Sequence, residues 1–222
     1  MFHVKQNLLA AVFCLSSFAA FPQGAYTYKP QNVKFALSSD SALTNKLVAL
    51  PDFGQLNAFE KDFLFYLNYV RRHPRQFNKE ALVPFLTAYP MLKPTYGESL
   101  SKELELLSTL PDLIVDMRLV KIARLHAADL ATNDIMSHQS SNGTTTQQRF
   151  EKAGVGCGSE CINLAKDTDA LNILISLLID FNVQNLGHRK TLLNPKMSLV
   201  GIGEAINPKS KLHYTVIDVG CQ

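Results

Sequence analysis

The chain has 222 residues, 46% of them hydrophobic and 18% charged, and its formal net charge is +3. These values are typical of a single folded domain and exclude a disordered chain. The positive charge is small and scattered, which argues against nucleic acid as a partner. We interpret the one basic run, "RRHPR" at 71–75, as the solvated end of a helix.

Residues 1–24 are typical of an export signal. Lys5 precedes an apolar stretch at 8–21, which is shorter than the ~20 residues that span a bilayer, and small residues follow it. No later segment has the length of a transmembrane helix, so we expect a secreted or periplasmic protein. Residues 25–55 show no sustained period and are interpreted as a leader or linker, which leaves 56–222 as the folded domain.

Helical patterns dominate this domain. Asn57 and Glu60 have capping-box spacing at the start of a helix that Pro74 ends. Asp116 is the expected N-cap of a helix over 116–134, and residues 168–181 are apolar nearly all round, which indicates a deeply buried helix. Two shorter helical stretches are predicted at 78–89, interrupted by Pro84, and at 101–110.

The period changes near the end of the chain. Residues 198–206 and 211–220 are predicted strands joined as a long hairpin. The segments at 137–150 and 153–161 are interpreted as a turn-rich run and a glycine-punctuated loop. Helices packed on a small, mainly antiparallel sheet that is completed late in the sequence define the α+β class.

Four polar groups stand in unusual places. His138 follows a helix end, Glu160 lies in the glycine-punctuated loop, Asp180 interrupts an apolar helix, and His188 follows a glycine that permits a sharp turn. An unpaired carboxylate among apolar residues is costly, so Asp180 needs a partner, an edge position or a helix to cap. Two imidazoles and two carboxylates suit a divalent metal site or a general acid–base set. A satisfied hydrogen-bond network is the structural alternative.

Other histidines have simpler interpretations. His126 lies in an apolar helix stripe and is expected in the core with one hydrogen bond, whereas Glu204 and His213 are expected to face solvent. A thiol-hydrolase triad of Cys161, His188 and Asp180 is disfavoured, since disulfide chemistry better explains cysteines in an exported chain.

Three cysteines remain after signal removal, Cys157, Cys161 and Cys221. At least one disulfide is expected in an oxidising compartment. A short bridge between Cys157 and Cys161 is feasible, and Cys221 can equally pair with either, so the sequence leaves the pairing open.

Blocks in a particular order give the chain a family resemblance between about residues 56 and 220. They are "FLFYLNYVRRHPRQFNKEALVPFL", "ARLHAADLATNDIMSHQSSNGTTTQQRFEKAGV", "SECIN" and "LLIDFNVQNLGHRKTLLNPKMSLVGIGEA". This order resembles the CAP superfamily of cysteine-rich secretory, antigen 5 and pathogenesis-related class-1 proteins, whose module is also called the SCP domain, and in particular its exported bacterial branch. The resemblance implies a three-layer α-β-α sandwich.

The resemblance also implies a central cleft formed by His138, Glu160, Asp180 and His188, in which the two histidines hold a divalent ion, often zinc. Two positions depart from the family pattern. Ser159-Glu160-Cys161 stands where the family has Gly-Glu-Asn, and Asp180 stands where many animal members have glutamate. The shorter side chain of Asp180 argues against direct metal ligation by that group.

We therefore expect a secreted binding module rather than an enzyme, with no assigned catalytic residue. Relatives are associated with sterol, lipid or envelope ligands, and the sequence names no ligand. One alternative is a metal-assisted hydrolase, a peptidase or esterase with Glu160 as general base. Two protein nitrogens are a small ligand set for a catalytic zinc ion, which usually has three protein ligands. Another alternative is a structural adhesin without metal.

Overall fold

A computed structural model describes residues 31, 33–166 and 169–221 of the chain. The predicted export signal at 1–24 lies outside the described residues. No helix within the described ranges combines the length and the apolar character that a membrane span requires.

The described strands form one mixed sheet with the order β1-β3-β4-β2. β3 (Leu199–Ile206) and β4 (His213–Gly220) form the predicted hairpin, and β4 also pairs antiparallel with β2 (Gly158–Ala165). The short β1 (Ile114–Val115) pairs parallel with β3. β2 is therefore an edge strand, and the sheet is mainly antiparallel, as the sequence predicts.

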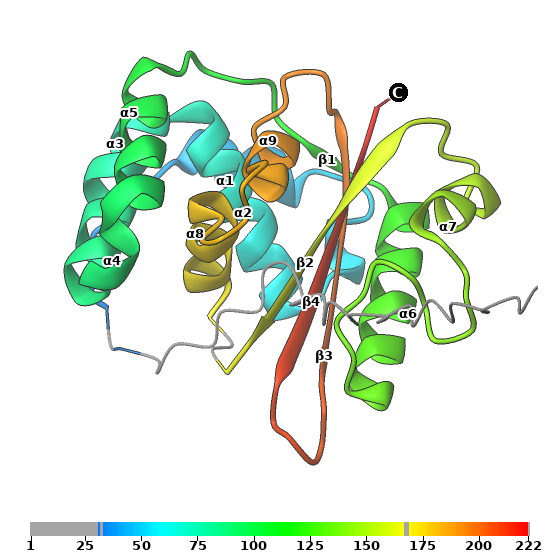
Figure 1. Ribbon diagram of the computed structural model, residues 1–222. Coiled ribbons are helices and arrows are strands. Elements are labelled where there is room, and N and C mark those ends of the chain that lie inside the picture. The colour runs from blue at the N-terminus through cyan, green and yellow to red at the C-terminus, as the bar shows by residue number, and fades with distance from the viewer. Residues whose placement is uncertain (1–30, 32, 167–168, 222) are drawn as a thin grey trace, which may run out of the picture.

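Helices cover both faces of this sheet and make three layers (Figure 1). α6 (Met117–Asn133) and α7 (Thr146–Lys152) lie on one face, and α2 (Ala58–Arg72) and α8 (Ala170–Ile179) lie on the other. The α-β-α sandwich is confirmed. The remaining helices are α1 (Ser41–Val48), α3 (Pro74–Phe77), α4 (Val83–Ala88), α5 (Glu98–Leu106) and α9 (Gly187–Leu192), with shorter 3₁₀ or π turns at Phe53–Gln55, Asn78–Leu82, Pro90–Leu92 and Lys93–Gly97.

Local sequence signals explain the main helix boundaries. Asn57 and Glu60 form the predicted capping box of α2, and Asp116 caps α6 by accepting from the Arg118 amide. Pro84 does not interrupt its helix as expected. The helical run continues through it, because the π turn Asn78–Leu82 leads directly into the first turn of α4, where Pro84 lies.

The segments at 41–48 and 71–75 also differ from the sequence-based expectation. Ser41–Val48, inside the range interpreted as a leader or linker, is a helix whose Leu43 and Leu47 are buried in the core. Two buried positions are too few to reveal a helical period. Arg71, expected at a solvated helix end, is fully buried and donates to the carbonyls of Pro111, Leu192 and Asn194, while burial lowers the pKa of its guanidinium to about 10.

α6 approaches β3 very closely at two glycines. A Cβ atom built on Gly201 would lie 2.1 Å from the Leu119 carbonyl carbon, and one built on Gly203 would lie 2.3 Å from the Ala123 carbonyl carbon. Both glycines are on the strand face that carries Asp218 and Val216 in the neighbouring strand. The helix backbone therefore rests on the strand backbone, directly beside the polar groups described below.

Candidate functional site

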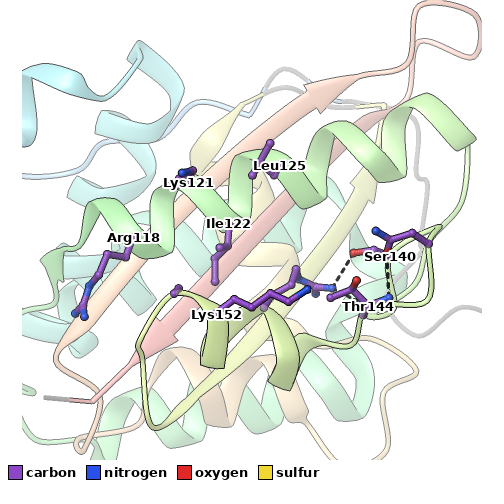
Figure 2. Close-up of a pocket in the computed structure, with 10 residues that line it drawn as sticks. Arg118, Lys121, Ile122, Leu125, Ser140, Thr144 and Lys152 are labelled. Carbon is purple, nitrogen blue, oxygen red and sulfur yellow. Dashed lines mark hydrogen bonds between the residues drawn. The ribbon is translucent and has the colours of Figure 1, made fainter.

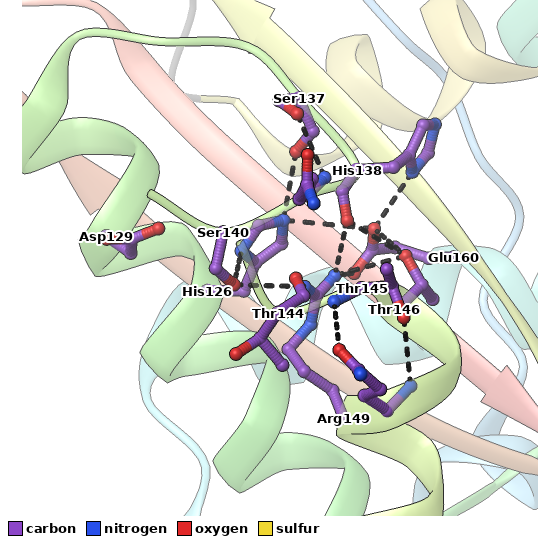
Figure 3. A network of polar contacts seen from close by, with 12 residues as sticks. His126, Asp129, Ser137, His138, Ser140, Thr144, Thr145, Thr146, Arg149 and Glu160 are labelled. Carbon is purple, nitrogen blue, oxygen red and sulfur yellow. Dashed lines mark hydrogen bonds and ion pairs between the residues drawn. The ribbon is translucent and has the colours of Figure 1, made fainter. Parts of the chain in front are cut away.

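His138 and Glu160 form the first of two histidine–carboxylate pairs. His138 lies in the loop between α6 and α7, and its Nδ1 is 2.8 Å from Oε1 of Glu160 in β2 (Figure 3). The His138 side chain is 52% exposed, whereas that of Glu160 is 1% exposed. A buried carboxylate thus orients an imidazole that reaches solvent. Glu160 lies in a strand, not in the loop that the sequence analysis expected.

Both oxygens of Glu160 are engaged. Thr146 donates its hydroxyl to Oε1 over 3.0 Å, and Arg149 of α7 pairs with Oε2. Burial acts to raise the pKa of Glu160, but the hydrogen bond with His138 and the positive charges of His126 and Arg149 bring this pKa below its usual value. Glu160 is therefore ionised at neutral pH and already bound by its neighbours.

Arg149 and His126 hold the loop that carries His138 (Figure 3). Arg149 donates to the carbonyls of His138 and Thr144 and to the Ser140 hydroxyl. His126 Nε2 is 3.0 Å from the Ser137 carbonyl oxygen, and its Nδ1 is 3.2 Å from Ser140 Oγ. His126 is buried as predicted, yet it lies 3.8 Å from Glu160 and belongs to the same network. Burial lowers the pKa of its imidazole.

His188 and Asp180 form the second pair. Asp180 ends α8 in the left-handed conformation, at φ 58°, and its Oδ1 is 2.7 Å from His188 Nδ1. Its Oδ2 accepts from the backbone amides of His188 and Arg189, in the first turn of α9. Asp180 therefore has two roles: it orients the imidazole of His188, and it caps the N-terminus of α9. The turn before α9 is made by Leu186, at φ 51°, and not by Gly187 as expected.

Different faces of the edge strand β2 carry the contacts to α7 and to α9. Side chains alternate along a strand, so Glu160 and Cys161 face different layers. Glu160 meets α7, whereas the Cys161 sulfur is 3.9 Å from the carbonyl oxygen of His188 in α9. Ser159, on the same side as Cys161, also contacts Thr191 of α9. Glu160 and Asp180 thus orient their histidines from different layers of the sandwich.

A cavity of about 670 Å³ adjoins the first pair. It is lined by His138, Thr146, Gln147, Phe150, Glu151, Val155, Gly156, Cys157, Gly158, Ser159 and Glu160. Asp180 and His188 are not part of this lining. Across the described ranges, no three side chains of the types His, Cys, Asp and Glu are grouped so as to hold a metal ion. A common hollow for all four predicted residues stays a prediction.

Asp218, like Arg149, was not predicted from the sequence as part of the site. It is paired with Glu160 in the strand register, is fully buried, and neither of its carboxyl oxygens has a hydrogen-bond partner among the described residues. Burial and the charge of Glu160 raise the pKa of Asp218 well above its usual value. One signal for its burial was present in the sequence. Side chains alternate along a strand, so "HYTVIDVG" places Asp218 on the same face as the apolar side chains of Tyr214 and Val216.

A further histidine–carboxylate contact lies on the β3–β4 hairpin. His213 was expected to face solvent, but it is fully buried and its Nε2 is 2.6 Å from Glu204 Oε2. The ring also packs edge-on against Phe59 of α2. Single-strand alternation could not reveal this contact, because α2 covers the hairpin from a distant part of the sequence.

The structure pairs Cys157 with Cys221, with a Cα–Cα distance of 5.7 Å, and leaves Cys161 free and buried. Burial, together with the nearby acidic groups, raises the pKa of the Cys161 thiol well above its usual value. A neutral, enclosed thiol is a poor nucleophile, which argues against the thiol-hydrolase alternative.

The fold and the two pairs define an α-β-α sandwich with carboxylate-oriented histidines near an edge strand. The profile of the cysteine-rich secretory protein family (CAP) matches residues 66–219. The chain belongs to this family, as its block order indicates.

Comparisons with individual proteins add no closer assignment. The comparison with curated proteins finds no match. An extracellular SCP-domain protein of Bacillus anthracis is 20% identical with a TM-score of 0.41, and the alignment covers 57% of this chain and 39% of that one. An outer surface protein of Borrelia burgdorferi is 23% identical with a TM-score of 0.43, over 59% and 92% of the two chains. A cysteine-rich secretory protein of Staphylococcus aureus is 17% identical with a TM-score of 0.34, over 59% and 38%.

Proposed function

We propose that this CAP domain is an exported, non-enzymatic binding module in which His138 and His188 hold a divalent cation, with zinc as the best candidate. The observation that supports this proposal is the shared design of the two pairs. In each, a carboxylate fixes Nδ1, and no described residue bonds to Nε2. Imidazoles that ligate metals are typically oriented in this way by a carboxylate on the other nitrogen.

The donor set fits a loosely held ion. Two imidazole nitrogens leave most coordination positions to water or to a ligand, and the exposure of His138 keeps its side open. A bound divalent ion would supply a Lewis-acid centre for an oxygen atom of that ligand. The cavity beside His138 offers room for a small-molecule, lipid or envelope-derived ligand, whose identity we leave open.

Zinc titration by calorimetry tests this proposal. We expect one bound ion per chain, with the affinity lost in His138→Ala and in His188→Ala, and lowered about 10- to 100-fold in Glu160→Gln. His73→Ala is a matched control, because His73 is also paired with a carboxylate, Asp40, but lies at the end of α2. Absence of heat with the unmodified protein, or full affinity in His138→Ala, would favour the metal-free structural alternative.

The hydrolase alternative gains no support from Glu160. A general base must be able to take a proton from water, yet His138 and Thr146 occupy one oxygen of Glu160 and Arg149 occupies the other. This arrangement favours an orienting role. Metal-dependent hydrolysis of a peptide or ester library that Glu160→Gln abolishes would reverse this conclusion.

A further inference from the structure

A second hollow lies between α6 and α7 (Figure 2). Its volume is about 510 Å³, within the range of small-molecule sites. It is lined by Arg118, Lys121, Ile122, Leu125, Ser140, Asn142, Thr144, Arg149, Lys152 and Ala153. We call this hollow the α6–α7 groove. None of its lining residues is acidic.

The α6–α7 groove and the cavity beside His138 use different sides of α7. Thr146, Gln147, Phe150 and Glu151 line the cavity, whereas Arg149, Lys152 and Ala153 line the groove. The spacing of these residues along the helix places the two sets on different sides of α7. A ligand in the groove would therefore leave the His138 cavity open.

Two lysines give the groove an uncompensated positive charge. Lys121 of α6 and Lys152 of α7 are exposed, and neither has an ion pair or a hydrogen bond to a described residue. Arg118 at one end is partly neutralised by Asp116 and also donates to the Gly154 carbonyl. The lysines are therefore the cations available to a negatively charged ligand.

The floor between these charges is apolar. Arg118, Lys121, Ile122 and Leu125 follow the spacing i, i+3, i+4 and i+7, so they share one face of α6. Leu125 is 61% exposed, and Ala153 of α7 contributes to the same surface. An exposed leucine between basic side chains favours a ligand that combines an apolar body with an anionic group.

Arg149 supplies the inner wall. It is buried, lines the groove, and has a guanidinium Nε without a hydrogen-bond partner in the described part of the chain. Its other nitrogens bind Ser140, Thr144 and Glu160. Arg149 therefore adds a fixed guanidinium to the groove wall, with its charge partly neutralised by Glu160.

We propose that the α6–α7 groove binds a compact organic anion, a carboxylate, sulfate or phosphate group on an apolar body. The anionic group lies between Lys121 and Lys152, and the apolar body covers Ile122 and Leu125. The polar residues Ser140, Asn142 and Thr144 close the end of the groove near Arg149. Neither His138 nor His188, the residues proposed to hold the metal, lines this groove.

Calorimetry with three probes tests the proposal, using naphthalenesulfonate, its uncharged sulfonamide and inorganic sulfate. We expect the sulfonate to bind one to one and the other two to bind at least about tenfold more weakly, because each lacks one half of the recognised chemistry. Lys121→Gln with Lys152→Gln should weaken sulfonate binding about fivefold or more, and added salt should weaken it further. Leu125→Ser should weaken the sulfonate and leave the response to sulfate unchanged.

Lys79→Gln with Lys209→Gln is the matched control. It removes the same charge from exposed positions outside the groove and should leave the affinity unchanged. Equal losses in both double variants would show that only net charge matters, and unchanged binding in the groove variant would place the probe elsewhere. Either result would overturn the proposal, as would the absence of sulfonate binding to the unmodified chain. His138→Ala should bind sulfonate normally, which separates this test from the zinc titration.

Discussion

At the scale of single residues, Asp218 has the most unusual environment. It lies in the middle of the polar network, beside an ionised Glu160, with no donor to its own oxygens among the described residues. A charged carboxyl group in this position would bear the full cost of burial and of repulsion from Glu160. We expect Asp218 to be protonated at neutral pH and to donate to Glu160.

Substitution Asp218→Asn tests this state through the pH dependence of stability. An aspartate in the unfolded chain titrates near pH 3.9. Because the folded-state pKa is raised, the contribution of Asp218 to stability is complete below that value and is lost as the pH rises toward the folded-state pKa. The asparagine variant lacks this loss, so its stability relative to the unmodified protein should increase between about pH 4 and about pH 7.

Urea unfolding at several pH values measures this difference, and infrared spectroscopy should detect a protonated carboxyl band that the variant lacks. Asp52→Asn, on a partly exposed turn, serves as a control that should change neither result. Loss of stability at neutral pH in Asp218→Asn, with no carboxyl band in the unmodified protein, would indicate an ionised Asp218 that is paired with Arg149.

The candidate site was predictable at this scale only for residues in irregular surroundings. His138, Asp180 and His188 attract attention because helix ends and apolar runs make them exceptional. Asp218 and Arg149 do not, since an acidic residue near a strand end and an arginine in a polar run are ordinary in sequence. Their proximity to Glu160 arises from strand register and from the packing of α7, which no local pattern contains.

At the scale of elements, the contact of α6 with β3 depends on Gly203. An added methyl group there would meet the backbone of Ala123 and Arg124, which has no flexible atom to move aside. We expect Gly203→Ala to destabilise the protein by about 1–3 kcal/mol or more. Gly156→Ala is the matched control, because nothing lies within 4 Å of its Cβ position. Urea denaturation compares the two, and equal midpoints would show that α6 can shift freely.

Helices with a clear apolar period were predictable, and short elements were not. α2, α6, α8 and the β3–β4 hairpin have caps or periods that mark them in the sequence. β2 was interpreted as part of a loop, because glycines precede it and "CINLA" is too short to distinguish a strand from a helix. α7 was missed although Thr145 and Gln148 form a capping box, since its seven residues include few apolar ones.

At the scale of the whole molecule, one disulfide connects the last described residue to the start of β2, across 64 positions. Its removal by Cys157→Ser with Cys221→Ser should cost about 2–4 kcal/mol of stability, measured by urea unfolding.

The fully buried Cys161 provides the contrast, because it has no disulfide partner. Alkylation with peptide mapping should leave Cys161 unlabelled in the folded protein and label it after unfolding without reductant. Labelling of Cys157 or Cys221 before reduction would contradict the observed pairing.

The fold class and the family were predictable from the order of the sequence blocks, because these are properties of the entire chain. The cysteine pairing was not, since each of the three cysteines has a plausible partner until the strands are placed. β2 and β4 run antiparallel, which brings Gly158 opposite Gly220 and so brings the flanking cysteines together.

The role of Asp180 has a consequence for saturation mutagenesis. This carboxylate ends one helix in a left-handed conformation, begins the next, and fixes an imidazole. Almost any replacement should reduce the amount of folded protein in a cell, whether or not ligand binding is selected. Scores at position 180 therefore become informative about binding only after normalisation to abundance, whereas scores at the half-exposed His138 can be interpreted directly.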